Sequence, residues 1–286
     1  MKVAVIGTGA MGRWLAGFAK QNLGEVVVAD ISATKAEKIA SELCVSSKPI
    51  VEAAAGADLV LVAVPISKTP EVVKSLAEVA RKDALIADVA SVKSDVVEAM
   101  QEAKVKLELV SIHPLFGPGA TSIKGKDFVV VPVRPGKRYA ELKRILVGLG
   151  ARVSEMKAEE HDRLMAIIQC MTHFVLLAYL NAIKSMRGLK QAEKIRTPMF
   201  ATLMNLAKAV LAGNPELYGE LQVYNRYARV VRSSMLEACR SLDIAFSAGD
   251  AKSARAMFKE ALAPFGAGEA KRAYEGLYKQ FEGGGA

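Results

Sequence analysis

The chain opens with the sequence KVAVIGTGAMG at residues 2–12. An apolar strand, Lys2–Ile6, runs directly into a GxGxxG motif that begins a helix. In such a turn Gly7 permits the tight bend, Gly9 lets the backbone approach a pyrophosphate, and Gly12 lets the helix pack closely on the strand. The pyrophosphate then lies at the helix N-terminus, where unpaired N–H groups and the helix dipole favour anions. The stretch therefore predicts a dinucleotide-binding turn.

Asp30 extends this prediction, because it follows a second expected strand over Glu25–Ala29. A carboxylate at this place accepts hydrogen bonds from the ribose diol and repels a 2′-phosphate, which favours NAD over NADP as the cofactor. No arginine follows closely to reverse that preference. The candidate cofactor-binding residues are Gly7, Thr8, Gly9, Ala10, Met11, Gly12, Asp30 and Pro65.

Two regions of different pattern follow each other along the chain. Residues 1–156 alternate apolar runs with amphipathic stretches, which predicts an α/β fold with a Rossmann-type, doubly wound, mainly parallel sheet. From residue 157 to 286, helical periodicity predicts an all-helical C-terminal domain, and the glycine-rich end at 283–286 is expected to fray. The expected strands are 2–6, 25–29, 59–64, 84–88, 108–112, 128–132 and 152–156, with helices among others at 69–81, 92–103 and 139–148.

Composition excludes several classes of protein. A hydrophobic content of 51% over 286 residues argues against intrinsic disorder. Cys44, Cys170 and Cys239 show neither CxxC spacing nor a Cys/His cluster, so we expect no disulfide framework, no metal site and a cytoplasmic protein. Residues 1–7 resemble a strand and not an apolar signal segment with a cleavage site, so we expect no export signal. The net charge of +9 is spread over both halves, which suits an anionic small substrate better than a nucleic acid.

One apolar segment, Leu164–Ile183, has no formal charge and the length of a membrane span, about 20 residues. It contains Gln169 and His173 among other polar residues, which are costly in lipid, and no second span accompanies it. We therefore expect a central buried helix, no membrane partner, and a pocket lined by its polar residues.

Two polar motifs follow neighbouring expected strands. Residues 88–94 and 113–118 come after the fourth and fifth parallel strands, and ligands of open α/β sheets bind outside such carboxyl ends. His113, one of three histidines, stands there beside a proline-rich loop. Hydride transfer from an alcohol needs a base near neutral pH, which imidazole provides. The alternative is a loop histidine bonded to backbone.

Taken together, four motifs resemble the prephenate/arogenate dehydrogenase family, the oxidative decarboxylases of tyrosine biosynthesis. They are GTGAMG, SVKS at 91–94, HPLFGP at 113–118 and HD-x6-Q-x3-HF at 161–174. The resemblance covers most of the chain, including Pro215–Tyr218. It implies a nucleotide-binding domain over 1–156, and a helical substrate and homodimerisation domain over 157–286, with the active site in the cleft between them. The implied reaction is the NAD-dependent conversion of prephenate, a small-molecule substrate, to 4-hydroxyphenylpyruvate.

The resemblance also implies roles for individual residues. His113 matches the catalytic base, and Ser91 matches the serine that hydrogen-bonds this histidine and the substrate hydroxyl. His173 matches a histidine lining the substrate site, with Gln169 one turn before it on the same helix face. A satisfied buried pair in a subunit interface is the alternative for these two. The pair His161-Asp162 is interpreted as an N-terminal capping and interdomain element.

The sequence departs from the family at Ala209, where an arginine usually grips the ring carboxylate. The adjacent Lys208 is the first choice for a substitute cation, although lysine lacks the bidentate fork of arginine. The other candidates in this domain are Arg196, Arg226, Arg229 and Arg232.

Three other functions stay open at this stage. An arogenate dehydrogenase differs in one or two pocket contacts. Another two-domain NAD(P)-dependent hydroxyacid dehydrogenase or imine reductase usually has a lysine on the long helix, where this chain has Gln169 and His173. A non-enzymatic NAD(H)-sensing dimer has no need of a base at His113.

Overall fold

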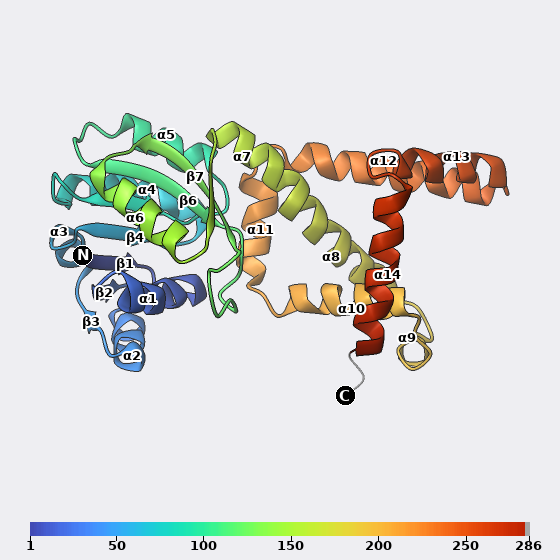
Figure 1. Cartoon of the computed structure of the whole chain (residues 1–286), viewed down its shortest axis with the longest axis horizontal. Coiled ribbons are helices and arrows are strands. Elements are labelled where there is room, and N and C mark those ends of the chain that lie inside the picture. Colours follow the sequence, from blue (N-terminus) through green and yellow to red (C-terminus); the bar gives the residue numbers. More distant parts are fainter. Residues whose placement is uncertain (284–286) are drawn as a thin grey trace. The chain divides into compact units, whose positions relative to one another are not determined.

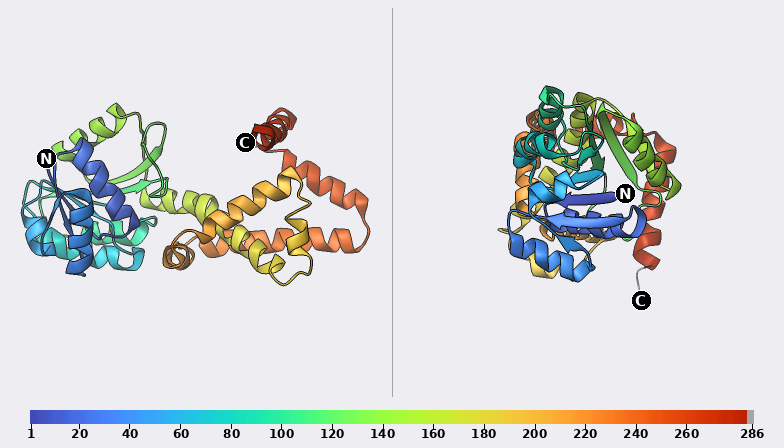
Figure 2. Two further views of the ribbon diagram at one scale, coloured as in Figure 1. Left: turned by 90° about the horizontal axis from the view of Figure 1, so that it is seen from below. Right: turned by 90° about the vertical axis from the view of Figure 1, so that its left-hand side faces the viewer.

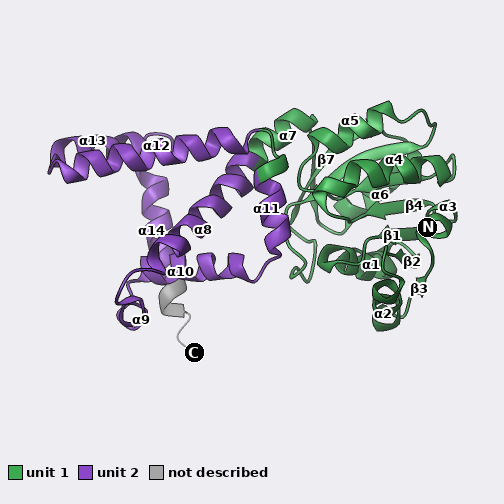
Figure 3. Ribbon diagram, turned by 180° about the vertical axis from the view of Figure 1, so that it is seen from behind, with its two compact units in different colours: residues 1–165, 223–226 green, residues 166–222, 227–286 purple. Residues whose placement is uncertain are grey.

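The computed structural model describes residues 1–283. Of the end at 283–286 that is expected to fray, Gly283 is the last residue of a helix and the other three residues lie outside the described part. The chain divides into two compact units, coloured separately in Figure 3. The first unit contains Met1–Met165 and Val223–Arg226, and the second contains Ala166–Gln222 and the chain from Tyr227 onward.

The first unit is built on one eight-stranded sheet in the order β3-β2-β1-β4-β5-β6-β7-β8. The strands are β1 Lys2–Ile6, β2 Glu25–Ala29, β3 Ser46–Ser47, β4 Leu59–Val62, β5 Leu85–Asp88, β6 Glu108–Pro114, β7 Asp127–Arg134 and β8 Arg152–Glu155. All neighbours pair in parallel except β6 and β7, so the predicted mainly parallel, doubly wound sheet is confirmed. The sequence did not reveal β3, because a two-residue edge strand leaves no apolar run.

Helices cover both faces of this sheet (Figures 1 and 2). Alternate residues of β1 show the division: Val3 and Val5 pack toward one set of helices, Ala4 and Ile6 toward the other. Burial on both faces is the reason that these strands are almost continuously apolar. One face holds α1 Ala10–Asn22, α2 Ala33–Leu43 and α6 Lys137–Gly148; the other holds α3 Ile50–Ala55, α4 Thr69–Val79 and α5 Ser94–Glu102.

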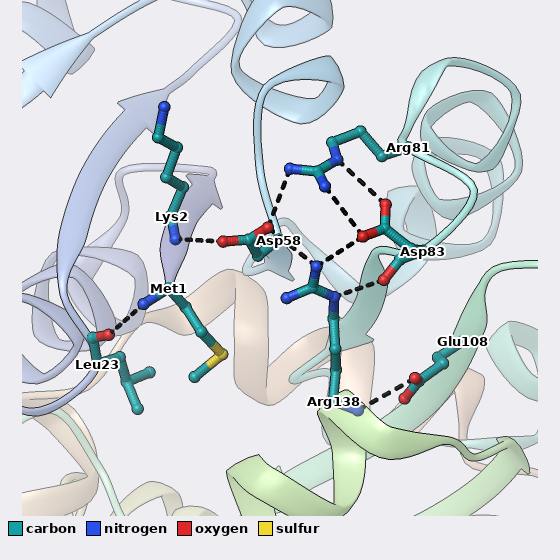
Figure 4. Close-up of polar contacts among 8 residues, drawn as sticks. All are labelled: Met1, Lys2, Leu23, Asp58, Arg81, Asp83, Glu108 and Arg138. Atoms are coloured by element: carbon teal, nitrogen blue, oxygen red, sulfur yellow. Dashed lines mark hydrogen bonds and ion pairs between the residues drawn. The ribbon is translucent and has the colours of Figure 1, made fainter.

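Charged side chains join the elements at the amino edge of the sheet (Figure 4). Arg138, on α6, places Nη2 3.0 Å from Asp58 Oδ1 and 2.8 Å from Asp83 Oδ2. Arg81 binds the same two carboxylates, and the backbone N–H of Lys2 donates to Asp58. We call Asp58, Arg81, Asp83 and Arg138 the amino-edge cluster. It ties α6 to the residues that precede β4 and β5.

The described part of the second unit is helical, as predicted for the C-terminal domain. The run that enters it starts in the first unit as α7 Ala158–Met165 and continues through the π-helical segment Ala166–Met171 to α8 Thr172–Ile183. The elements after these are α9 Leu189–Ala192, α10 Pro198–Leu211, α11 Pro215–Tyr224, α12 Ala228–Ser247, α13 Ala251–Leu262 and α14 Ala267–Gly283. Thr197 caps α10 and Asp250 caps α13, each accepting from backbone N–H groups in the first turn.

The helical run Ala158–Ile183 is long and apolar enough to cross a membrane, judged by length and composition alone, with a mean hydropathy of 1.6. Only 17% of its apolar window is buried in the single chain. The expectation of a buried central helix is therefore wrong for the single chain. Its physical reason is that the small core around Leu176 and Ala207 covers one side of the helix and leaves Ile167 and Ile168 exposed.

Candidate active site

The turn between β1 and α1 has the tightness that its glycines predict. Gly7 has φ +95°, and a Cβ added to it would lie 2.5 Å from the carbonyl oxygen of Ala63. A Cβ on Gly12 would lie 1.9 Å from the Gly7 oxygen, whereas one on Gly9 would meet nothing within 4 Å. No side chain of the described residues caps α1. The turn thus leaves open space and uncapped N–H groups, which is what a pyrophosphate needs.

Asp30 stands directly after β2 and closes this turn. Its Oδ2 accepts from the backbone N–H of Thr8 at 2.7 Å and from the Thr8 hydroxyl at 2.8 Å, and its Oδ1 accepts from Ser32 N–H at 3.0 Å. Burial raises the pKa of Asp30, but the hydrogen bonds from Ser32 and Thr8 outweigh it, and the pKa lies below its ordinary value. The neighbouring Ile31 is 97% exposed. An ionised carboxylate therefore lies beside the turn, and the residue that follows it is exposed to solvent.

The other predicted cofactor residues lie around the same sheet edge. Ala10 and Met11 form the first turn of α1. Pro65 follows β4, and its carbonyl accepts from the Thr69 hydroxyl at 3.0 Å. These positions agree with the carboxyl ends of parallel strands, where nucleotides bind.

A buried group of ionisable side chains occupies the carboxyl edge near β5 and β6. Its members are Asp88, Lys93, His113, His161 and Asp162, and we call it the carboxyl-edge cluster. His113 is 3% exposed and the other four are fully buried. His113 Nδ1 lies 2.8 Å from His161 Nε2, and His161 Nδ1 lies 2.8 Å from Asp162 Oδ1. The two histidines and the aspartate thus form a chain of hydrogen bonds.

Asp162 also binds the start of α5. Its Oδ1 accepts from Lys93 N–H at 2.8 Å, and its Oδ2 accepts from both the N–H and the hydroxyl of Ser94. The interpretation of His161-Asp162 as a cap of their own helix is therefore wrong: α7 begins at Ala158, and the carboxylate caps α5 instead. The reason is that a carboxylate in mid-helix can reach the unpaired N–H groups of a neighbouring helix.

Lys93 is a buried cation in the middle of this cluster. Its Nζ donates to Asp88 Oδ1 at 3.1 Å and to the carbonyl of Ile112 at 2.8 Å, one residue before His113. Burial lowers the pKa of Lys93, and the charge of Asp88 opposes this. In the described part of the chain, Asp88 Oδ2 and the hydroxyl of Ser111 are buried without a hydrogen-bond partner. Such atoms cost free energy and tend to mark functional positions.

Burial sets the protonation of the two histidines. It lowers the pKa of His113 well below the ordinary value of 6.5, and the nearby His161 and the charge of Lys93 act in the same direction. Burial also lowers the pKa of His161, although the hydrogen bond to Asp162 opposes it. His113 is consequently neutral at neutral pH, the form that can accept a proton.

Ser91 lies half-buried in the loop after β5. Among the described residues it is His161, and not Ser91, that bonds to His113 Nδ1. Sequence motifs alone predicted no catalytic part for His161, Asp162 or Lys93. Signals were present, because all three lie inside the motifs that carry the family resemblance.

The predicted substrate residues Gln169, His173 and Lys208 belong to the second unit. Gln169 lies in the π-helical segment, which replaces the regular α-helical spacing expected between it and His173. The ring of His173 packs edge-on against Tyr218, with centroids 4.6 Å apart. Within the described residues, His173 Nδ1 is buried without a hydrogen-bond partner, and burial lowers the pKa of this histidine.

The candidate cations have different surroundings, and one of them, Arg226, belongs to the first unit. Lys208 pairs with Glu193 at 2.5 Å on an exposed surface. Arg226 pairs with Asp95 and Glu98, and Arg232 donates to Gln222. Arg229 is exposed, and no ion pair or hydrogen bond with another described side chain engages it. The structure thus leaves Arg229 more available to an anion than Lys208.

Comparison with protein families matches both parts of the chain. Residues 15–155 match the model of the prephenate dehydrogenase nucleotide-binding domain, and residues 157–260 match the prephenate dehydrogenase dimerization domain. A 4-amino-4-deoxyprephenate dehydrogenase from Streptomyces pristinaespiralis is 32% identical over 90% of this chain and 88% of its own length. A probable arogenate/prephenate dehydrogenase from Methanocaldococcus jannaschii is 28% identical over 95% of this chain. The match spans 62% of that relative's length.

Among solved structures, prephenate dehydrogenase from A. aeolicus, in complex with hydroxyphenyl propionate and NAD+, has a TM-score of 0.74. The match covers 92% of this chain and 96% of that one, at 19% identity. This likeness shows a common fold.

Proposed function

The chain belongs to the prephenate dehydrogenase family, whose members are NAD-dependent oxidoreductases, and we propose that it converts prephenate to 4-hydroxyphenylpyruvate with NAD. The observation that carries the proposal is the neutral, buried imidazole of His113 at the carboxyl edge of a sheet whose first turn fits a dinucleotide. The same observation argues against a sensor without catalysis.

The protein residues have two tasks in this reaction, to bind the reactants in register and to hold a proton. Bound NAD supplies the hydride acceptor, and the Gly7–Gly12 turn and Asp30 would hold it. His113 takes the proton of the substrate C4 hydroxyl as the C4–H bond breaks and its two electrons leave as hydride. The bond to the ring carboxylate then breaks, CO₂ departs, and the electron pair completes the aromatic ring. His113 returns its proton to the phenolate oxygen, so atoms and charges balance.

We assign contacts with the substrate to Gln169 and His173, and a further polar contact with its hydroxyl to Ser91. The unpartnered Nδ1 of His173 supports this assignment, since a buried polar atom gains most from a ligand. The ring carboxylate needs a cation in place of the arginine that Ala209 replaces. Comparing Lys208→Ala with Arg229→Ala identifies it: loss of the true ligand should raise the KM for prephenate at least tenfold, an effect of about 1.4 kcal/mol, without changing the KM for NAD.

Substrate choice is tested by NADH formation with prephenate, arogenate and 4-amino-4-deoxyprephenate in parallel, each with NAD and NADP. The third compound is included because one relative is named for it. Turnover of prephenate with NAD supports the proposal. Preference for arogenate or for 4-amino-4-deoxyprephenate would show that prephenate is the wrong substrate. Absence of turnover with all three compounds would overturn the proposed function.

We further propose that the second unit pairs two subunits in a homodimer. It exposes large apolar side chains, including Ile168, Val230, Ile244 and Phe246, which are 53–70% exposed in the single chain. So many large exposed apolar side chains in one unit favour a covering partner, and a second copy provides it without a membrane. Light scattering over a dilution series without detergent should report a dimer, and Phe246→Asp should weaken it. A stable monomer at micromolar concentration would contradict the pairing.

The cysteines support the cytoplasm as the site of this activity. None of the three forms a disulfide in the described part of the chain, and the thiols of Cys44 and Cys239 are exposed. Exposed free thiols suit a reducing compartment.

A further inference from the structure

We propose that His161 and Asp162 are positioning residues that hold His113 with its proton on Nδ1, so that Nε2 is the atom that accepts the substrate proton. The inference rests on the proposed function only for the step that it serves. The tautomer itself follows from the hydrogen bonds of the first unit.

Asp162 is the fixed end of the hydrogen-bond chain from His113 through His161, because its carboxylate can only accept hydrogen bonds. Its Oδ1 accepts from the backbone N–H of Lys93, and its Oδ2 from the N–H and hydroxyl of Ser94. Burial raises the pKa of Asp162, but the bonds from His161, Ser94 and Lys93 outweigh it and keep the carboxyl ionised. An ionised carboxylate has no proton to donate.

His161 must therefore donate from Nδ1 to Asp162 across their 2.8 Å contact. A neutral imidazole has one N–H, so His161 Nε2 is an acceptor. His113 Nδ1, 2.8 Å from that atom, must in turn be the donor. The single proton of neutral His113 is thereby placed on Nδ1, and Nε2 has the lone pair.

The same hydrogen bonds stabilise His113 after it takes the proton from the substrate. The imidazolium donates from Nδ1 to the neutral His161, whose own N–H points at the carboxylate of Asp162. The opposing charge is Lys93, which lies beside Ile112 and disfavours the imidazolium, with Asp88 partly neutralising it. The ionisable groups named here come from three places: Asp88 ends β5, Lys93 directly precedes α5, and His161 and Asp162 lie in α7.

Nitrogen NMR of histidine-labelled protein tests the tautomer without any substrate. The chain has three histidines, and the spectrum of a His173→Gln variant separates the signals of His173 from the other two. We expect Nδ1 of His113 and His161 to be protonated at mildly alkaline pH. Asp162→Asn can offer an amide N–H to His161, which reverses both tautomers and blocks His113 Nε2 with a proton.

Kinetics provide the second readout. Asp162→Asn should lower kcat at least 100-fold with little change in the KM for NAD, the size expected when a general base is held in the wrong tautomer. Asp250→Asn is the matched control: it makes the same change at the cap of α13 and should leave kcat unchanged. Ser94→Ala removes one bond to Asp162 and should lower the melting temperature while leaving the histidine tautomers as in wild type.

The outcomes are distinct from those of the proposed function. A wild-type spectrum with His113 protonated on Nε2 would overturn the inference whichever substrate is used. Wild-type kcat in Asp162→Asn would do the same. A protein with Nδ1 protonated on both histidines that oxidises neither prephenate, arogenate nor 4-amino-4-deoxyprephenate would support the inference and overturn the proposed function.

Discussion

At the amino edge of the sheet, Arg81 and Arg138 share the carboxylates of Asp58 and Asp83, and the Asp83 side chain is 59% exposed (Figure 4). At the carboxyl edge, Asp88, Lys93, His113, His161 and Asp162 lie in the same first unit with almost no exposure. Both groups join neighbouring strands and helices. They differ in how far their side chains are exposed to solvent, and this difference determines what each group can do.

In the amino-edge cluster the Arg81 and Asp83 side chains are 43% and 59% exposed, whereas those of Arg138 and Asp58 are 21% and 19% exposed. Water therefore screens this cluster in part, and ion pairs with an exposed partner contribute little to stability. The hydrogen bond from Arg138 lowers the pKa of Asp83 against the effect of desolvation, and both partners stay ionised. Burial instead lowers the pKa of His113 and of Lys93 at the carboxyl edge. A protein that keeps charges in such a costly place usually uses them in function.

Replacing His113 should give the largest effect and test this contrast directly. We expect His113→Asn to lower kcat by two or more orders of magnitude with little change in NAD affinity, because it removes the general base. Steady-state kinetics with prephenate and NAD measure this loss. We expect Ser91→Ala to lower kcat less than His113→Asn does. Near-wild-type turnover would remove the functional meaning of the carboxyl-edge cluster.

Cofactor choice should change next most strongly, through Asp30. The double variant Asp30→Ser with Ile31→Arg removes a carboxylate that repels a 2′-phosphate and adds a cation at an open position. We expect the ratio of kcat/KM for NADP to that for NAD to rise at least tenfold. A wild-type enzyme that already prefers NADP would refute the role of Asp30.

The Lys93–Asp88 pair should affect the pH profile more than the maximal rate. Lys93→Met alone leaves Asp88 buried and unpaired, which costs about 3–5 kcal/mol, so the test is the double variant Lys93→Met with Asp88→Asn. The base must be neutral, and kcat falls as the pH drops through the pKa of His113. Loss of the Lys93 charge raises that pKa, so the acid limb of kcat against pH should move to higher pH.

The stability of the fold should depend on pH through the two buried histidines of the carboxyl-edge cluster. Because folding lowers the pKa of His113 and His161, the unfolded chain binds more protons below pH 6.5, and the wild-type melting temperature should fall as the pH drops from there toward the folded pKa values.

The kinetic test of Lys93 has its own contrary outcome. If the acid limb of kcat against pH does not move in Lys93→Met with Asp88→Asn, the charge of Lys93 does not influence the pKa of His113.

The smallest effect should come from the amino-edge cluster. Asp83→Asn keeps the shape of the side chain and removes one exposed charge between Arg81 and Arg138. We expect unchanged kcat, an unchanged pH profile and a small drop in melting temperature that high salt reduces. A marked loss of activity would show that the two edges do not differ as their burial indicates.

Local pattern was enough for the fold of the first unit. The seven strands expected between residues 2 and 156 are present, and the glycine turn has the predicted geometry, because short apolar runs and glycine spacing express short-range constraints. The place of His113 at a strand end was predictable for the same reason. The antiparallel pairing of β7 with β6 was not, since the run of apolar residues is the same in either direction.

The sequence by itself determined the α/β sheet, the nucleotide turn, the helical second domain and the residue types of the family motifs. Only the tertiary structure decided which side chains meet. His161 reaches His113 across 48 residues of chain, Asp162 caps a helix that starts 68 residues earlier, and Lys208 is paired with Glu193. Periodicity reports which face of an element is buried, but contacts between distant elements depend on how those faces pack, and the protonation of a buried histidine depends on those contacts.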